Sequence, residues 1–247
     1  MNDNIPQLSV VILCYKAEDL APVFTAEVQK VLEDEHISFE LVLVANYNAH
    51  ERASDRTPAI VRELAKNDPR IVVVSKEKQG MMGWDMRSGL TAATGQTIAV
   101  IDGDGQMPAG DVLKVYTALL ESGADMAKTY RVLRYDGLKR KIISWIYNGF
   151  LKVLFPRVRV RDANSKPKIF RRQGFDQMTL CADDWFIDAE MIIQASYLGF
   201  TIKETPTVFH PNTKRASFVR PRALLEFIYN LMVYRLRHIR GVKRSRP

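Results

Sequence analysis

Short apolar runs alternate with amphipathic helical segments through the first half of this 247-residue chain. The runs are rich in Val, Ile and Leu, which is typical of buried strands, and the segments between them repeat apolar residues at helical spacing. This alternation predicts an α/β fold with a mostly parallel central sheet and helices on both faces. The expected strands cover residues 8–13, 39–44, 71–74 and 97–101, and the expected helices 18–34, 57–67, 83–93 and 108–122.

The second half is less regular and is expected to complete the same domain. Its predicted elements are an apolar and basic stretch over 138–155, a strand over 167–171, a helix over 184–198 that ends at Gly199, an edge strand over 201–208 and a helix over 222–240. We therefore expect one domain over residues 1–220, with halves 1–127 and 128–220, followed by a basic amphipathic helix and tail over residues 221–247.

Charge is distributed unevenly along the chain. The formal net charge is +8, but residues 1–127 carry 11 Lys and Arg against 19 Asp and Glu, whereas residues 128–172 carry 14 against 2 and residues 214–247 carry 10 against 1. This segregation indicates a polyanionic partner for the second half. A nucleic-acid-binding module is a competing interpretation, but the sequence lacks helix-turn-helix, zinc-binding and aromatic RNA-binding signatures, so we expect no nucleic-acid partner.

The cysteine content and the ends of the chain bear on its compartment. Cys14 and Cys181 are the only cysteines, which is typical of a reducing environment. The first residues lack the basic and apolar regions of a signal peptide, and no apolar run reaches the ~20 residues that span a bilayer. We expect a cytoplasmic protein, peripheral at the inner face of the membrane. Its C-terminal helix either docks on the domain or binds anionic lipid, and the oligomeric state is left open.

The pentapeptide Asp102-Gly103-Asp104-Gly105-Gln106 directly follows the apolar run of residues 97–101. Two carboxylates one residue apart, on a sharp turn after a strand, suit a hard divalent cation with oxygen ligands such as Mg²⁺ or Mn²⁺. Ligands of open α/β sheets also bind at the carboxyl edge. Taken alone, the same residues are better interpreted as an ordinary Asp/Gly turn.

Further segments accompany this turn in a fixed order. They are residues 14–18, 80–89, 92–95 before the turn at 102–108, 128–131, 162–172, 186–190, and 204–208 with 214–218. This series resembles that of the family-two inverting glycosyltransferases, and is most similar to the dolichol-phosphate-mannose synthase and polyprenyl-phosphate glycosyltransferase group. The resemblance covers about residues 8–220 and implies their A-type nucleotide-diphospho-sugar transferase fold.

The resemblance also implies an activity: metal-dependent, inverting transfer of a sugar from a nucleotide-diphosphate donor to a polyprenyl (lipid) phosphate, with Mg²⁺ or Mn²⁺ as cofactor. It assigns the metal to Asp102, Asp104 and Gln106, and catalysis to Asp104, Arg131, Asp188 and Glu190. It assigns the donor to Leu13, Tyr15, Glu18, Asn46, Gly80, Arg87, Asp102, Gly103 and Asp104. It assigns the acceptor phosphate to Lys128, Arg131, Lys166, Lys168, Lys214 and Arg215.

Several alternatives remain open at this level. Asn46 stands where the family commonly carries an acidic residue that recognises the base, so neither base nor sugar follows from the sequence. Asp188 and Glu190 are interpreted as sugar ligands, as a base for a hydroxyl acceptor, or as a cap of the helix near residue 185. The histidines lack metal spacing, and Trp145 is expected to pack. Competing functions are transfer to a glycan or lipid-linked sugar in surface-polysaccharide assembly, and a non-catalytic nucleotide- or lipid-binding relative.

Overall fold

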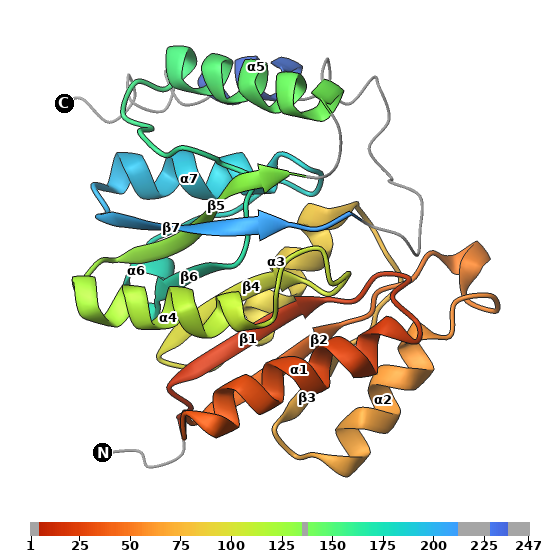
Figure 1. Cartoon of the computed structure of the whole chain (residues 1–247). Coiled ribbons are helices and arrows are strands. Elements are labelled where there is room, and N and C mark those ends of the chain that lie inside the picture. The colour runs from red at the N-terminus through yellow and green to blue at the C-terminus, as the bar shows by residue number, and fades with distance from the viewer. Residues whose placement is uncertain (1–4, 135–137, 212–227, 237–247) are drawn as a thin grey trace.

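The computed structural model describes residues 5–134, 138–211 and 228–236, which form a layered α/β structure (Figure 1). The sheet has the strand order β3-β2-β1-β4-β6-β5-β7. Its strands are β1 (Leu8–Leu13), β2 (Phe39–Val44), β3 (Ile71–Val74), β4 (Thr97–Asp102), β5 (Met126–Arg134), β6 (Lys168–Arg171) and β7 (Ile202–Phe209). The helices are α1 (Leu20–Asp34), η1 (Ala49–Glu51), α2 (Thr57–Asn67), α3 (Met82–Ala92), α4 (Gly110–Ser122), α5 (Leu138–Leu154), α6 (Arg172–Phe175) and α7 (Ile187–Leu198).

The predicted mostly parallel sheet is confirmed, with one reversed strand. β1 pairs in parallel with β2 and β4, β2 with β3, and β5 with β7 at the edge. β6 is antiparallel to both β4 and β5, and its Lys168 pairs with Val100. Because β6 runs backwards, the residues just before it lie at the carboxyl end of β4. The chain from the second half therefore enters the sheet beside Asp102.

Local signals account for most element boundaries. α2 starts at Thr57, whose backbone N–H donates to Asp55 Oδ1 at 3.0 Å, and α7 ends at Gly199 with φ of 82°. The helix expected from residue 184 begins only at Ile187, because Asp184 lies ahead of it and accepts the N–H of Phe186 at 2.8 Å. The apolar pattern alone does not predict β5, because polar residues such as Lys128 interrupt it.

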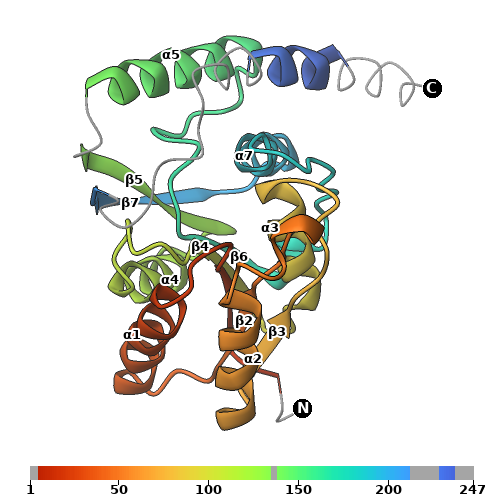
Figure 2. The same cartoon turned by 90° about the vertical axis from the view of Figure 1, so that its right-hand side faces the viewer.

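The sheet is covered on both faces, and its strands alternate between two cores. Val10 and Ile12 of β1 face a core completed by α1, α2 and α4, whereas Val11 and Leu13 face a second core under α3 and α7. α5 lies outside α7 (Figure 2), and its Tyr147 and Leu151, with Phe155 just after the helix, belong to that second core.

The described part of the C-terminal segment docks on the domain. Leu231 in the helix over residues 228–236 is fully buried, and the Tyr234 ring lies 5.1 Å from the Phe186 ring. The remainder of the expected helix and tail lies outside the described residues. Within the described part of the chain, no helix has the length and apolarity that crossing a bilayer requires.

Gly89 on α3 tests the packing of this helix on the sheet. A Cβ at Gly89 would lie 2.5 Å from both Val11 Cγ1 and Val44 Cγ2, so Gly89→Ala forces helix and sheet apart. We expect a loss of about 1–3 kcal/mol in the free energy of unfolding, measured by urea denaturation. Gly110→Ala is the matched control, because a Cβ there meets no atom within 4 Å. Equal unfolding midpoints for the two variants would contradict this account.

Candidate active site

The expected metal turn leaves the sheet where β1, β2 and β4 end at the same level. Leu13 pairs with Val44 on one side and with Asp102 on the other. The backbone N–H of Gly103 then donates to Leu13 O at 3.0 Å. A Cβ on Gly103 would lie 2.9 Å from Ile12 Cγ2, so only glycine allows the turn to lie this close to β1. The turn is thus fixed at the carboxyl edge, as the sequence predicted.

The two carboxylates of the turn have different surroundings. Both Oδ atoms of Asp102 lie 3.1 Å from Lys166 Nζ. Asp104 follows two residues later, and its Oδ1 accepts the N–H of Gln106 at 3.1 Å. Gln106 Nε2 donates to His210 O at 3.1 Å, while the His210 N–H donates to Gln106 O at 2.8 Å. The turn is therefore joined to the end of β7, and His210 lies beside it. The spacing of the histidines in the sequence does not predict this position.

A buried ion cluster lies behind Asp102. Lys166 Nζ is 3.2 Å from Asp188 Oδ2, and Lys168 pairs with Asp188 Oδ1. Burial alone would raise the pKa of Asp188, but the two ammonium groups hold it below its usual range. Burial lowers the pKa of Lys168 to about 8 against the opposing effect of Asp188. For Lys166, Asp102 and Asp188 together outweigh burial and raise its pKa.

Two other expected acceptor ligands lie in the interior. Lys128 is fully buried, and its Nζ donates to the carbonyl oxygens of Thr129 and Asp162. Burial lowers the pKa of this ammonium. Arg131 binds Asp162 through two contacts, Nε to Oδ2 at 2.6 Å and Nη2 to Oδ1 at 2.8 Å. Both side chains therefore link β5 to the segment before β6. Lys168 likewise links β6 to α7. Lys214 and Arg215 lie outside the described residues.

The segment over residues 181–184 connects the glycine-rich loop to α7. The N–H of Met81 donates to Asp183 O at 2.7 Å, and Arg87 Nη1 contacts Cys181 O at 2.8 Å and Asp183 Oδ1 at 2.7 Å. A Cβ on Gly80 would lie 2.9 Å from Asp183 Cβ, which explains the glycine in this loop.

Glu190 holds the same segment from the other side. Its Oε2 accepts the N–H groups of Cys181 at 3.0 Å and Ala182 at 2.8 Å. Burial raises the pKa of this carboxyl. Arg87 and Glu190 thus position residues 181–184. The capping role considered for Asp188 or Glu190 is wrong, because the N-cap position of α7 is Phe186 and no side chain caps the helix there.

The end of β2 carries a second buried polar group. Asn46 Nδ2 donates to Asp85 Oδ1 at 2.9 Å and Ser88 Oγ at 3.0 Å, and its Oδ1 accepts the N–H of Lys76 at 2.8 Å. Lys78 pairs with Asp85, and its Nζ lies 4.1 Å from the centre of the Tyr15 ring. Asn46 therefore links the end of β2 to α3 and to the residues after β3, and Asp85 on α3 is a buried carboxylate for which the sequence carries no separate signal.

The first loop completes the edge of the site. The N–H of Glu18 donates to Thr57 Oγ1 at 3.0 Å, which ties the loop after β1 to the start of α2. Glu18 Oε2 lies 3.7 Å from Arg56 Nη2 in an exposed pair. The Tyr15 hydroxyl accepts from Asn48 Nδ2 at 2.9 Å. Leu13, Tyr15, Glu18 and Asn46 are thus brought to the same edge as the turn.

The turn fits a divalent cation in its donor chemistry. Asp104 and Asp102 supply carboxylate oxygens at a solvent-accessible edge, and Gln106 supplies an amide oxygen on the same turn. Among the described residues, no three His, Cys, Asp or Glu side chains form a closed metal cage. This is the arrangement expected for Mg²⁺ or Mn²⁺ that is shared between one or two carboxylates and a substrate phosphate.

Comparison with known proteins agrees with this geometry. The model of glycosyl transferase family 2 matches residues 9–179. The chain belongs to this family. The glycosyltransferase AglD of Haloferax volcanii is 30% identical over 183 residues, which cover 70% of this chain and 28% of that protein. The prophage bactoprenol glucosyl transferase homolog of Escherichia coli is 31% identical over 157 residues, covering 62% of this chain and 48% of that protein.

Solved structures confirm the fold expected for family 2. Glucosyl-3-phosphoglycerate synthase from Mycobacterium tuberculosis, in complex with Mn²⁺, uridine-diphosphate-glucose and phosphoglyceric acid, superposes with a TM-score of 0.71 at 16% identity. The match covers 93% of this chain and 79% of that chain. This chain spans at most about half the length of the curated relatives it matches. The similarity therefore identifies the family of this domain.

Asp188 should stabilise the folded domain in a pH-dependent way. Asp188→Asn leaves Lys166 and Lys168 without their shared carboxylate, and we expect a loss of about 3–5 kcal/mol in urea unfolding at pH 7. Since the folded-state pKa is lowered, this contribution is present above the unfolded-state pKa of about 3.9 and is lost as pH falls through the folded-state value. The two proteins should therefore converge in stability at acidic pH.

Glu63→Gln is the control for that experiment, because its carboxylate pairs with Lys66 on the surface and should contribute less than about 1 kcal/mol. A constant stability difference between the unchanged protein and Asp188→Asn down to pH 3 would show that Asp188 does not act through its charge.

Proposed function

We propose that this chain is a metal-dependent, inverting glycosyltransferase that moves a sugar from a nucleotide-diphosphate donor to a lipid phosphate. The observation that carries this proposal is the Asp102-Gly103-Asp104 turn, fixed at the carboxyl edge of a family 2 fold. Solved relatives of the same fold bind uridine diphosphate with Mn²⁺ or Mg²⁺, and curated relatives are bactoprenol glucosyl transferases. The uridine diphosphate in those structures supports the proposed donor class, and the bactoprenol of those relatives supports the proposed acceptor class.

The residues of the turn suit departure of a nucleoside diphosphate. A bound divalent cation would neutralise negative charge on the leaving diphosphate. Asp104, at the outer end of the turn, would hold that cation, and Gly103 allows the donor to approach the backbone closely. Tyr15 and the group around Asn46 would form the wall that contacts the base.

The state of the nearby carboxylates favours a phosphate acceptor. A hydroxyl acceptor needs a general base to take its proton, whereas a phosphate is already ionised and needs only to be positioned. Asp188 is a poor base, since two lysines hold its pKa below the usual range. Glu190 has a raised pKa, but its carboxylate is used by the N–H groups of Cys181 and Ala182. Neither carboxylate assigned as a base is free to accept a proton from a substrate.

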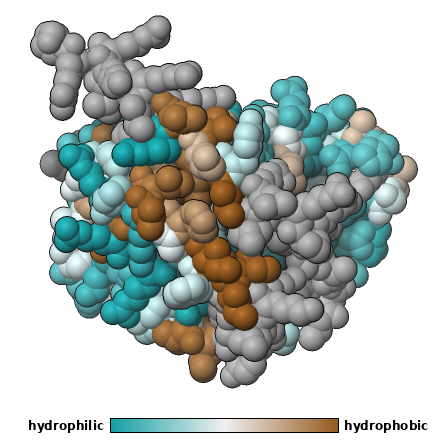
Figure 3. All heavy atoms as spheres, turned by 90° about the horizontal axis from the view of Figure 1, so that it is seen from above, coloured by the Kyte–Doolittle hydropathy of each residue, from teal (hydrophilic) through white to brown (hydrophobic). Residues whose placement is uncertain are grey.

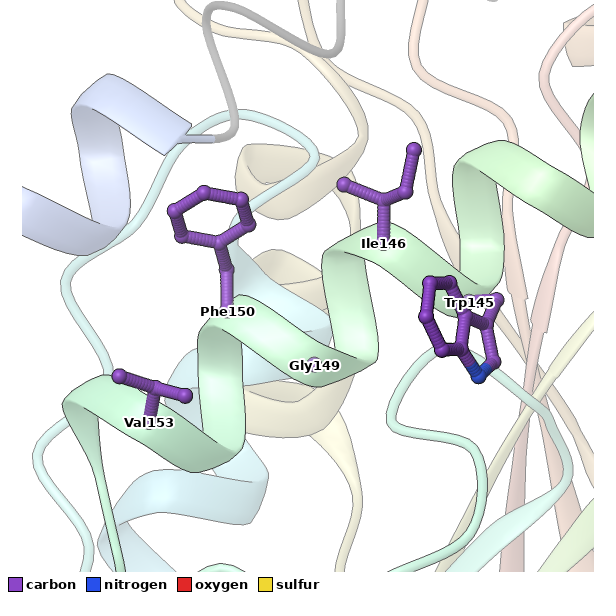
Figure 4. Close-up of a pocket in the computed structure, with 5 residues that line it drawn as sticks. All are labelled: Trp145, Ile146, Gly149, Phe150 and Val153. Atoms are coloured by element: carbon purple, nitrogen blue, oxygen red, sulfur yellow. The ribbon is translucent and has the colours of Figure 1, made fainter.

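The outer surface of α5 supports a lipid acceptor. Trp145 is 79% exposed and Val153 77% exposed, contrary to the expectation that Trp145 packs. With Ile146, Gly149 and Phe150 they line a shallow hollow of about 300 Å³ (Figure 4). Figure 3 shows the apolar side chains gathered on the face of the molecule that carries α5. An exposed apolar helix face of this kind is typical of proteins that lie in the membrane interface.

The helix over residues 228–236 extends this face. Its side chains of Tyr229, Met232 and Leu236 are more than half exposed, while Leu231 anchors it to the domain. The helix therefore combines the two alternatives raised by the sequence, docking on the domain with one side and offering apolar side chains on the other. We propose peripheral attachment of this face to a membrane that contains anionic lipid.

Asp104 provides the direct test of the reaction. Asp104→Asn removes one charge from the turn without changing its shape, and we expect transfer to fall by at least about 100-fold. The measurement is transfer of labelled sugar from uridine or guanosine diphosphate donors to undecaprenyl phosphate with Mn²⁺ or Mg²⁺. Asp176→Asn is the matched control, since this carboxylate pairs with Arg172 near the opposite edge of the sheet. Full activity of Asp104→Asn would refute the proposal.

Membrane attachment is tested separately by flotation with phosphatidylglycerol vesicles. Trp145→Glu and Val153→Glu place a charge on the outer surface of α5, and each should weaken vesicle partitioning by about tenfold. Val23→Glu is the control, because Val23 is an exposed apolar residue of α1 in a different layer. Equal flotation of all three variants, or flotation that does not depend on anionic lipid, would contradict attachment through α5.

A further inference from the structure

The helix over residues 228–236 is held to the domain by polar contacts as well as by buried Leu231. It lies in the outer layer with α5, outside α7 (Figure 2). Asn230 Nδ2 donates to Asp184 Oδ2 at 2.7 Å, and the Tyr234 hydroxyl accepts from Gln194 Nε2 at 3.2 Å. Residues four positions apart share one side of a helix, so both contacts come from the side that faces the domain.

Both contacts lead to the segment over residues 181–184. Asp184 is the last residue of this segment and meets Asn230 directly. At the other end the connection runs through two side chains of α7. Gln194 Nε2 lies 3.4 Å from Glu190 Oε1, and Glu190 Oε2 accepts the first two backbone N–H groups of the segment at 3.0 and 2.8 Å. The C-terminal helix therefore reaches both ends of the segment.

The segment in turn supports the glycine-rich loop and the first turn of α3. The backbone oxygen of Asp183 accepts the N–H of Met81 at 2.7 Å and the N–H of Trp84 at 3.2 Å. A Cβ on Gly83 would lie 2.5 and 2.6 Å from two carbonyl oxygens of the segment, so the two backbones are in direct contact. A displacement of the segment would therefore displace the loop as well.

We propose that Asn230 and Tyr234 are positioning residues for the donor, which hold the glycine-rich loop in its nucleotide-binding arrangement through residues 181–184. This inference rests on the proposed function, because it takes Gly80 and Arg87 as part of the donor site. Neither positioning side chain is assigned a contact with the donor. A protein whose binding arrangement is populated only part of the time binds its ligand more weakly by that fraction. Docking of the C-terminal helix thereby sets the affinity for the nucleotide.

The first test measures binding of uridine or guanosine diphosphate with Mn²⁺ to the full chain by isothermal titration calorimetry, without vesicles. Asn230→Ala and Tyr234→Phe each remove one hydrogen bond, and we expect each to raise the Kd about three- to tenfold. Gln29→Ala is the matched control and should leave the Kd unchanged, because Gln29 Nε2 donates to Asp68 Oδ2 at the same 2.7 Å on the α1 side of the sheet. A Kd that stays unchanged in both helix variants would overturn the proposal.

An exchange of side chains separates positioning from a general loss of stability. Asn230→Asp places a second carboxylate against Asp184 and should weaken nucleotide binding more than Asn230→Ala. Adding Asp184→Asn restores one donor and one acceptor to the pair at the original net charge, and the new amide oxygen can still accept the N–H of Phe186. We expect the double variant to recover a Kd within about twofold of the unchanged protein. A double variant that binds no better than Asn230→Asp would overturn the role of Asn230.

Transfer kinetics distinguish this inference from the proposed function. Asn230→Ala and Tyr234→Phe should raise the KM for the nucleotide sugar about three- to tenfold, while kcat and the KM for undecaprenyl phosphate stay within about twofold. A helix that only stabilised the fold would lower the urea midpoint without moving the donor KM. If the unchanged protein binds neither nucleotide, the proposed function fails and the inference fails with it. If it binds and transfers while both variants keep its donor KM, the inference alone fails.

Discussion

The parallel register of β1 with β2 and β4 is the constraint on which the site depends. Leu13 lies level with Val44 and with Asp102, so three strands end together at one edge. In a strand, a shift of one residue would turn each side chain to the opposite face, carrying Asp102 away from Lys166 and the apolar residues of β4 out of their cores. The buried face of each strand therefore also fixes the position of the Asp102-Gly103-Asp104 turn. Packing and site geometry are determined by the same register.

Part of the uneven charge distribution along the chain is accounted for by ion pairs inside the domain. Residues 1–127 are acidic and residues 128–172 basic, a segregation that by sequence alone indicates a polyanionic partner. In the structure, Lys166, Lys168 and Arg131 of the basic segment pair with Asp102, Asp188 and Asp162. Much of the basic excess near the site thus stabilises internal contacts, and fewer cations are left to bind a substrate phosphate than a count of charges implies.

The sequence predicted elements and turns well because local patterns determine them. The strand before Asp102, the start of α2 at Thr57 and the end of α7 at Gly199 each follow from neighbouring residues. It did not predict contacts that depend on how distant segments meet. The antiparallel entry of β6 places Lys166 on Asp102 across 64 positions, and Asn46 meets Asp85 on α3 across 39. Contacts between residues so far apart in sequence leave no periodic pattern. For the same reason the sequence did not predict that Lys128 binds backbone carbonyls in the interior.

The position of α5 sets a geometric condition on any lipid acceptor. α5 covers α7, and α7 carries Asp188 and faces the sheet (Figure 2). Packed helices lie about 8–10 Å apart, and both α5 and α7 lie between a membrane on the outer surface of α5 and the ion cluster, so the cluster would be about two helical layers from that membrane. The polar headgroup region of one leaflet is only about 5–8 Å deep. A lipid phosphate would therefore have to reach the site by way of the carboxyl edge of the sheet and not through α5, whereas a soluble glycan needs no membrane nearby. Attachment through the exposed Trp145 and entry of the acceptor phosphate are thus two separate geometric requirements if the acceptor is a lipid.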